Sequence, residues 1–428
     1  MSIILALLIF SAIVLFHELG HFLLAKKSGI TVVEFSLGMG PRLLSTVRGG
    51  TRYSLKAFPL GGSCAMLGED TDEVAEGSFN AASVWKRICV VAAGPVFNFI
   101  LAFVFAVVIV GFTGYDPAKV VQVNEDSAAY EAGLREGDRI VRYDGYAVDL
   151  ARDLYVYMYL NPLEEGKTVR MDVDRDGERV HIAFLPDLNT RYLLGFNRSD
   201  VNSMRVESLI PGLPLEDTGI VPGDTITAVN GVEIKDGADY EAYLSEHPLD
   251  GSEIRITYVH DGLEYEASLK PEAYSTPVGG FAYNTGYTRT KGFGVVKYAL
   301  LEMKYMIRST LLSLRELVTG GLGIRDLSGP VGVVDAIGQT YEQSKSEGAF
   351  TILINMLSMA ILLSTNLGVM NLLPVPALDG GRLVFLFVEA VRRKPLNRNL
   401  EGSIHFTGLV LLMILMAFVM YQDILKLF

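Results

Sequence analysis

Two histidines and a glutamate near the start of the chain have the spacing of a catalytic metal site. They stand in the sequence His17-Glu18-Leu19-Gly20-His21, inside an apolar run. Histidines four residues apart lie on one face of a helix, so both imidazoles can reach one ion. Glu18 lies about 100° around the helix from His17, close enough to contact a water molecule bound to that ion. The spacing therefore predicts a metal site in which Glu18 is the general base.

The alternative is a pair of packed core histidines beside a surface glutamate. The surrounding apolar run weighs against it, because an ionisable group in the middle of a membrane span costs about 2.5–3.5 kcal/mol on insertion scales. Three such groups so close together need a partner that stabilises them, and a bound cation would be that partner.

Asp379 is the candidate for a third ligand. A catalytic zinc ion usually has three protein ligands and keeps a fourth position for water. Asp379 stands in the sequence NLLPVPALDGG, residues 371–381, at the end of another apolar run. An Asp-Gly turn that opens a helix is a common alternative, but it does not explain the Pro-x-Pro break. We predict that Asp379 completes the site with His17 and His21.

Four apolar runs are long enough to cross a bilayer, which needs about 20 residues. No basic residue precedes the first run and Lys26 and Lys27 follow it, so it is expected to be a retained span rather than a signal peptide. The four runs are Ile3 to Ala25, Val90 to Phe112, Phe350 to Leu373 and His405 to Tyr421.

Lysine and arginine are concentrated between the first and second runs and between the third and fourth. The positive-inside rule predicts that both of these segments are cytoplasmic. His21 and Asp379 then lie at the same membrane face. The middle of the chain and both termini are expected to face outward.

The middle of the chain, from Asp116 to Thr290, is acidic and contributes largely to the net charge of -12, which excludes nucleic acid as a partner. It contains an internal repeat: residues 132–140 and 218–226 each include Gly-Asp, and Asp-Gly or Asn-Gly follows each copy. These dipeptides are typical of tight turns beside strands. The repeat predicts a duplicated β-rich domain, for which a structural role as a stable outer cap is the simplest interpretation.

Three further features lie outside these motifs. Thr31 to Leu67 alternates as strands do, and a free strand edge there could bind an unwound substrate, with proline at Lys56 as the test. Phe293 to Thr319 has the pattern of an amphipathic helix, packed or lying on the membrane surface. His405 begins the last apolar run, where snorkelling to the interface is its simplest explanation.

The paired motifs resemble those of the site-2 protease family of intramembrane metalloproteases. The match consists of HExxH in the first run, residues 371–380 downstream, and GPVFN at residues 94–98 in the second run. The duplicated middle resembles tandem PDZ domains, an arrangement similar to that of bacterial regulator of sigma-E proteases. This resemblance implies a filter that admits only substrates trimmed by a first protease, and such domains can also bind exposed chain ends. The resemblance covers essentially the whole chain.

This resemblance implies a function and a set of roles. The cofactor is Zn²⁺, held by His17, His21 and Asp379, with Glu18 as the catalytic base. Asn371 is expected to hold the substrate backbone, and Asn98 either contacts substrate or forms a helix–helix hydrogen bond. The implied partners are the lipid bilayer and single-span substrates such as anti-sigma factors already cut once outside the membrane, with remnant signal peptides as further substrates. A non-catalytic membrane PDZ adaptor with a structural metal is the alternative, but a closed structural site normally has four protein ligands.

The expected fold is a polytopic α-helical membrane protein with about four transmembrane helices, a membrane-associated β-hairpin or sheet region, and an inserted tandem PDZ-like α+β domain. Its expected place is a bacterial cell membrane, with the PDZ-like domains extracytoplasmic. The expected boundaries are 1–115 for the first half of the membrane domain, 116–200 and 201–290 for the PDZ-like domains, 291–349 for the amphipathic helix and connector, and 350–428 for the second half of the membrane domain.

Overall fold

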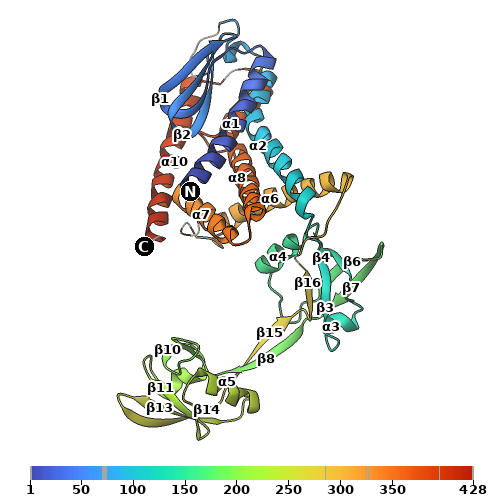
Figure 1. Cartoon of the computed structure of the whole chain (residues 1–428), viewed down its shortest axis with the longest axis vertical. Coiled ribbons are helices and arrows are strands. Elements are labelled where there is room, and N and C mark those ends of the chain that lie inside the picture. The colour runs from blue at the N-terminus through green and yellow to red at the C-terminus, as the bar shows by residue number, and fades with distance from the viewer. Residues whose placement is uncertain are drawn as a thin grey trace. The chain divides into compact units, whose positions relative to one another are not determined.

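A computed structural model describes residues 2–69, 75–284, 286–323, 325, 327–394 and 396–426. The chain divides into two compact units (Figure 1). The first unit combines residues 1–117 with 285–428, and the second comprises residues 118–284. The candidate site residues all belong to the first unit.

Four helices of the first unit are long and apolar enough to cross a membrane, which makes this a membrane protein. Helix α2 contacts both α1 and α8. Small residues permit this packing: a Cβ on Gly20 would lie 2.4 Å from the carbonyl oxygen of Ala93, and one on Gly368 would lie 2.9 Å from the Phe99 ring. The four helices correspond to the four predicted runs, the third of which extends one residue beyond its helix. They are α1 (Ser2–Ser28), α2 (Val84–Thr113), α8 (Ala349–Leu372) and α10 (Arg398–Lys426).

A small sheet follows α1 and packs against it. It is built from two long, bent strands, β1 (Val32–Arg48) and β2 (Thr51–Met66). Residues 34–37 of β1 pair on one side with 52–55 of β2 and on the other side with 62–65 of β2. The end of β1, residues 42–48, pairs with 51–56 of β2. The segments 42–48 and 62–66 are therefore the two outer segments. Glu34 links the two inner segments to the outer segment 42–48, because its carboxylate accepts hydrogen bonds from Arg42 and Ser54. These hydrogen bonds also lower the pKa of Glu34 to about 2.

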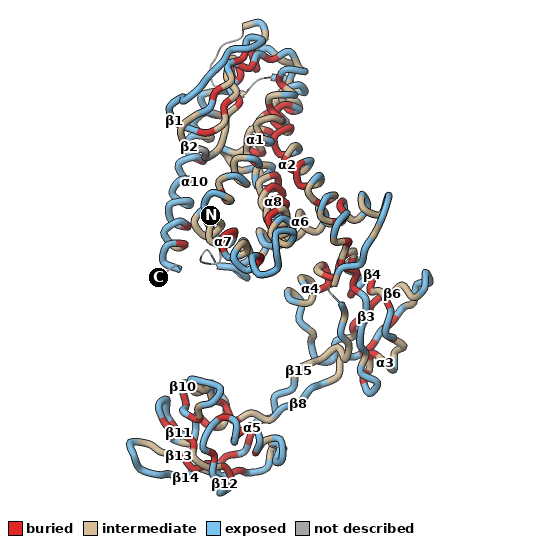
Figure 2. The backbone as a smooth tube through the Cα atoms, in the orientation of Figure 1, coloured by how far each residue is buried: buried red, intermediate tan, exposed pale blue. Residues whose placement is uncertain are grey.

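Three further helices lie in the described part of the first unit, and the short η1 (Phe79–Ala81) precedes α2. Helix α6 (Phe293–Thr319) packs Ala299 against Ala102 and Ala106 of α2 and leaves its other face exposed, so the amphipathic segment is both packed and partly open (Figure 2). Helix α7 (Pro330–Lys345) contacts α1 and α8, and α9 (Asp379–Arg392) contacts α2.

The second unit consists of two lobes, each with its own buried core. Lobe 1 has a sheet in the order β16-β3-β4-β6-β7, with β5 beside β4, and lobe 2 has one in the order β12-β11-β13-β14 and the pair β9-β10. The elements of lobe 1 are β3 (Lys119–Val123), α3 (Ala128–Glu131), β4 (Arg139–Tyr143), β5 (Tyr146–Ala147), α4 (Ala151–Leu160), β6 (Val169–Arg175), β7 (Glu178–Phe184) and β16 (Phe281–Asn284). Those of lobe 2 are β9 (Phe196–Arg198), β10 (Val206–Leu209), η2 (Pro214–Thr218), β11 (Thr225–Val229), β12 (Val232–Glu233), α5 (Gly237–Glu246), β13 (Ile254–His260) and β14 (Leu263–Leu269).

Lobe 2 is inserted into lobe 1. The paired strands β8 (Asp187–Leu193) and β15 (Glu272–Val278) lead out of lobe 1 and back, and β16 then pairs with β3. Leu194 packs in the core of lobe 2, on the other side of the expected boundary at residue 200. The structure therefore places residues 194–200 in lobe 2 and residues 281–284 in lobe 1, unlike the expected boundaries. A linear repeat in the sequence does not reveal that β16 returns to complete the sheet of lobe 1.

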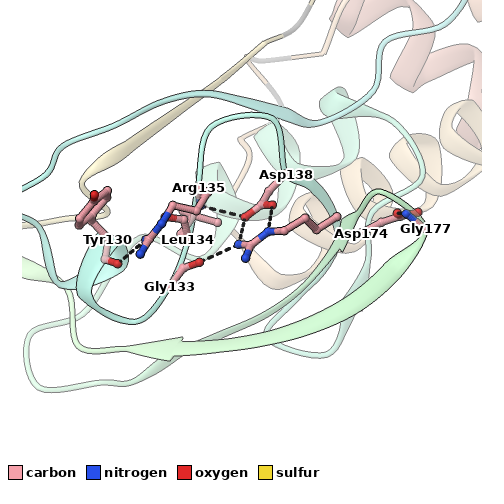
Figure 3. A network of polar contacts seen from close by, with 8 residues as sticks. Tyr130, Gly133, Leu134, Arg135, Asp138, Asp174 and Gly177 are labelled. Carbon is pink, nitrogen blue, oxygen red and sulfur yellow. Dashed lines mark hydrogen bonds and ion pairs between the residues drawn. The ribbon is translucent and has the colours of Figure 1, made fainter.

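The two copies of the sequence repeat build the same buried carboxylate in the two lobes. In lobe 1, Asp138 accepts a hydrogen bond from the backbone N–H of Arg135 and forms a two-pronged ion pair with Arg175, at 2.7 and 2.8 Å (Figure 3). In lobe 2, Asp224 accepts from the N–H of Val221 and faces Nδ1 of His260 at 2.7 Å. The cation is therefore permanent in lobe 1 and titratable in lobe 2.

We predict that lobe 2, unlike lobe 1, loses stability as pH rises. The hydrogen bond with Asp224 raises the pKa of His260 above its ordinary value of 6.5. With a raised pKa, the charged imidazole stabilises the folded lobe fully below about pH 6.5, and this contribution is lost as pH rises through the higher, folded-state pKa. Hydrogen exchange of the full chain should show protection in β13 falling relative to β6 between about pH 6 and 8, after correction for intrinsic exchange.

The corresponding pair in lobe 1 does not titrate, because Arg175 keeps its charge across this range. Lobe 1 also contains the pair of His181 with Asp172 on β6, so a variant of His260 is the decisive control. His260→Gln should remove the pH-dependent difference between the lobes. A difference of the same size in the variant would show that another group is responsible.

Candidate metal centre

Helix α1 places the two histidines of the first motif side by side. His17 and His21 are separated by one helical turn, and their Nε2 atoms lie 3.2 Å apart. The ring planes stand at 82° with centroids 4.8 Å apart. Both residues are buried in the packing of α1 against α2. This is the arrangement in which two imidazoles can share one ion.

Asp379, the first residue of α9, brings a carboxylate oxygen to the same point. Its Oδ2 lies 3.2 Å from Nε2 of His17 and 3.5 Å from Nε2 of His21. Tetrahedral zinc with bonds of about 2.0–2.2 Å separates its ligand atoms by about 3.3–3.6 Å. Oδ2 is buried and has no hydrogen-bond donor among the residues that the structure describes. The three groups therefore fit a zinc ion, and their chemistry is that of a catalytic donor set.

The carboxylate of Asp379 is held in its charged form. Burial by itself would raise its pKa, but the adjacent imidazoles of His17 and His21 outweigh burial and lower the pKa of Asp379 below its usual range. An ionised carboxylate is the form that binds a metal ion.

Each histidine also contacts a polar group on α2. Nδ1 of His21 lies 2.9 Å from the backbone carbonyl oxygen of Val90, to which it donates its proton, leaving Nε2 free. Nδ1 of His17 lies 3.2 Å from the side-chain amide of Asn98. Asn98 is fully buried, and its backbone carbonyl accepts a hydrogen bond from the Ser364 hydroxyl on α8 at 2.8 Å.

A glycine of α2 lies directly against both imidazoles. A Cβ on Gly94 would be 2.3 Å from Nε2 of His21 and 2.7 Å from Cε1 of His17. No side chain fits at this position while the rings keep their places. Gly94 begins the GPVFN motif of residues 94–98, but the sequence alone did not predict its contact with His17 and His21.

Glu18 points to a different neighbour from the histidines. Its half-buried side chain lies beside β2, where a Cβ on Gly62 would be 3.2 Å from its Cγ. The next buried residue of this strand segment is Cys64. The outer segment 62–66 of the small sheet thus borders the proposed base.

The loop before α9 fixes the position of Asp379. Gly380 and Gly381 let it fold tightly, since a Cβ on either would lie within 2.5 Å of the backbone of residues 372–375. Ion pairs from Arg382 to Glu69 and from Arg87 to Glu389 anchor α9 to its surroundings.

The other residues singled out in the sequence lie in different surroundings. Asn371 occupies the last turn of α8 with a partly exposed side chain that has no hydrogen-bond partner among the described residues. His405 does not simply extend to the interface as expected: it accepts a hydrogen bond from the backbone N–H of Ala377. Lys56 lies in an inner segment of the sheet, opposite Arg42, so proline there would disrupt the sheet itself rather than a free edge.

Comparison with known proteins gives one family over most of the chain. Residues 5–415 match the model of peptidase family M50. The zinc metalloprotease RasP of Geobacillus kaustophilus is 31% identical over 440 residues, which cover 100% of this chain and 98% of that protein. The regulator of sigma-W protease RasP of Bacillus subtilis is 31% identical over 471 residues, covering 100% and 99%.

A search of solved structures found a further similarity. The crystal structure of the HtrA3 PDZ domain bound to a phage-derived ligand matches with 18% identity and a TM-score of 0.18, covering 21% of this chain and 93% of that domain.

Substitution of Gly94 should weaken metal binding. In Gly94→Ala the new Cβ would overlap Nε2 of His21, so the ring must leave its position. We expect zinc affinity of the detergent-purified protein to fall at least about tenfold, measured by competition with a chelating dye. Gly111→Ala is the matched control on the same helix, because its Cβ would make only an ordinary contact, 3.9 Å from Val295. Equal zinc affinity in the two variants would contradict the packing argument.

Proposed function

This chain belongs to peptidase family M50, the site-2 proteases, and on that premise we propose that it is an intramembrane zinc metalloprotease that cuts within the transmembrane segments of other proteins. The resemblance recognised in the sequence is thereby confirmed at the level of the family. The observation that carries the proposal is the convergence of His17, His21 and Asp379 on one point inside a membrane protein.

In this proposal His17, His21 and Asp379 hold the zinc ion. When bound, zinc lowers the pKa of a water ligand and polarises the scissile carbonyl group. The Glu18 carboxylate accepts a proton from the attacking water and transfers it to the leaving amine nitrogen. The position of Glu18 supports this role, because it is the next residue after His17 on α1 and lies beside the outer segment 62–66.

Asn98 is proposed to orient His17 rather than to bind substrate. Its buried Oδ1 has no hydrogen-bond partner among the described residues, while Nδ2 faces Nδ1 of His17. The two ends of an amide are assigned by hydrogen bonding, and the reversed orientation lets Oδ1 accept the N–H of His17. Nε2 of His17 is then free for the metal, as Nε2 of His21 is. Asn371, partly exposed at the end of α8, remains the proposed contact for the substrate backbone.

The proposed substrates are single-span proteins such as anti-sigma factors that a first protease has already trimmed outside the membrane, with remnant signal peptides as a second group. The name of the Bacillus subtilis relative, a regulator of sigma-W, supports this class. The distribution of basic residues supports a bacterial cell membrane location with the site near the cytoplasmic face and both lobes outside. The lobes are proposed to be PDZ-like domains that restrict access of untrimmed substrates.

Cleavage of a single-span substrate in liposomes tests the proposed reaction. Wild type should cut, a zinc chelator should stop it, and Glu18→Gln should retain zinc but lower the rate at least about a hundredfold, because it removes general base catalysis. Zinc is quantified in the same samples.

The same assay separates the rival adaptor function. A Glu18→Gln variant that cuts at the wild-type rate, or a zinc-loaded wild type that cuts neither a trimmed nor an untrimmed substrate, would favour a non-catalytic adaptor. Offering both substrates also tests the outer lobes, since a filter predicts faster cutting of the trimmed one.

Capture of substrate at the sheet edge is the second part of the proposal. A membrane helix uses its carbonyls in its own hydrogen bonds, so it must unwind before water can attack. The outer segment 62–66 borders Glu18 and offers an edge to which an extended segment could add.

Disulfide cross-linking distinguishes edge addition from helical docking. A cysteine replaces the exposed Ala65 in a Cys64→Ser, Cys89→Ser, Glu18→Gln background, and a cysteine is moved stepwise along the substrate span. Edge addition predicts cross-links at alternate substrate positions. Leu44→Cys, exposed in the opposite outer segment 42–48, is the control and should give none. Cross-links repeating every three to four positions would instead show a helical substrate.

A further inference from the structure

The loop that delivers Asp379 to the metal site has a strained backbone. It runs from the end of α8 at Leu372 to the start of α9, and Ala377 within it adopts a φ of +76°. This left-handed conformation is unfavourable for a residue with a Cβ and persists only where the surroundings enforce it. Ala377 lies two residues before Asp379, so whatever holds it also sets the direction of the carboxylate.

Helix α10 makes the contacts that hold this loop. Nδ1 of His405 accepts a hydrogen bond from the backbone N–H of Ala377 at 2.9 Å. Almost one turn further along α10, a Cβ on Gly408 would lie 2.5 Å from Cβ of Pro376 and 2.7 Å from its carbonyl oxygen. The His405 ring also rests against Phe385 of α9, with centroids 5.4 Å apart. One face of α10 is therefore fitted to the backbone immediately before Asp379.

These contacts stand out because α10 is otherwise mostly exposed (Figure 2). A second buried polar contact lies near the end of α10. There Asp423 accepts hydrogen bonds from the backbone N–H groups of Gly329 and Gly332 at the start of α7, at 3.1 and 2.8 Å. The helix is thus fixed near both ends. Large apolar residues between the two anchors are exposed, as expected for a helix facing lipid.

We propose that His405 is a positioning residue of the metal centre, through which α10 holds the strained Ala377 backbone and thereby the Asp379 carboxylate in place. This inference rests on the proposed role of Asp379 as a zinc ligand. His405 itself does not touch the site. Its Nδ1 is the acceptor, so the neutral imidazole carries its proton on Nε2.

Zinc retention by the full chain in detergent tests this role with two matched variants. Asn places an acceptor oxygen where His has Nδ1, whereas Leu has a similar size and no acceptor. We expect His405→Leu to release zinc to a chelator roughly tenfold or more faster than wild type, the size of effect typical of outer-shell changes. His405→Asn should stay within about threefold of wild type. Equal behaviour of the two variants, whether both retain or both lose zinc, would overturn the proposal.

A second substitution tests whether the hydrogen bond acts through backbone strain. Glycine adopts a positive φ at little cost, so Ala377→Gly should make the loop less dependent on His405. In the His405→Leu background, Ala377→Gly should reverse at least about half of the increase in the logarithm of the zinc release rate. A double-mutant cycle measures this coupling between the two positions. No recovery in a folded double variant would overturn the strained-loop mechanism.

The outcomes separate this inference from the proposed function. A wild-type chain that binds no stoichiometric zinc would refute the metal site itself. A wild type that binds zinc and a His405→Leu variant that holds it equally well would refute only the positioning role. Thermal unfolding of each variant identifies a loss of zinc that merely follows global unfolding.

Discussion

The close approach of α1 and α2 is the constraint on which the site depends. Two imidazoles are held inside an apolar helix pair, where an unpaired polar group is costly. Gly20 allows the backbones to meet and Gly94 leaves the space that the rings occupy. Because α2 approaches so closely, the carbonyl of Val90 and the amide of Asn98 can contact the two Nδ1 atoms directly. A larger residue at either glycine would separate the ligands from the groups that orient them.

The third proposed ligand is held in a different way from the first two. His17 and His21 lie on continuous helix, where one turn of backbone sets their spacing. Asp379 begins a helix after a short, strained loop, and glycines, ion pairs and α10 together fix its position. The site therefore joins a ligand pair set by local geometry to a ligand set by tertiary contacts. Affinity for the metal should be more sensitive to distant packing at Asp379 than at the histidines.

The sequence revealed the parts of the site that local spacing determines. HExxH specifies a helical face, and the charge bias of the loops predicted that Asp379 and His21 lie at the same face of the membrane. The structure brings the three side chains together, as that prediction requires. The four apolar runs likewise correspond to the four long helices. What could not be predicted depends on pairing between distant segments: the return of β16 to the first lobe, the inner position of Lys56, and the contact of His405 with Ala377. A lone histidine at the start of a span has no local signal that distinguishes a backbone contact from snorkelling.

Helix α1 also separates two tasks by direction. Its histidines face α2, which orients them, and Glu18 about 100° away faces the edge of β2. The histidine face is packed against α2, so in the proposed function an extended substrate approaches from the side of the sheet. A strand added at the segment 62–66 would bring its carbonyl groups to the base and the metal together, without disturbing the packing that holds the histidines. One face of α1, which carries His17 and His21, therefore packs against α2 in the membrane core. The face that carries Glu18 forms one wall of the proposed active site.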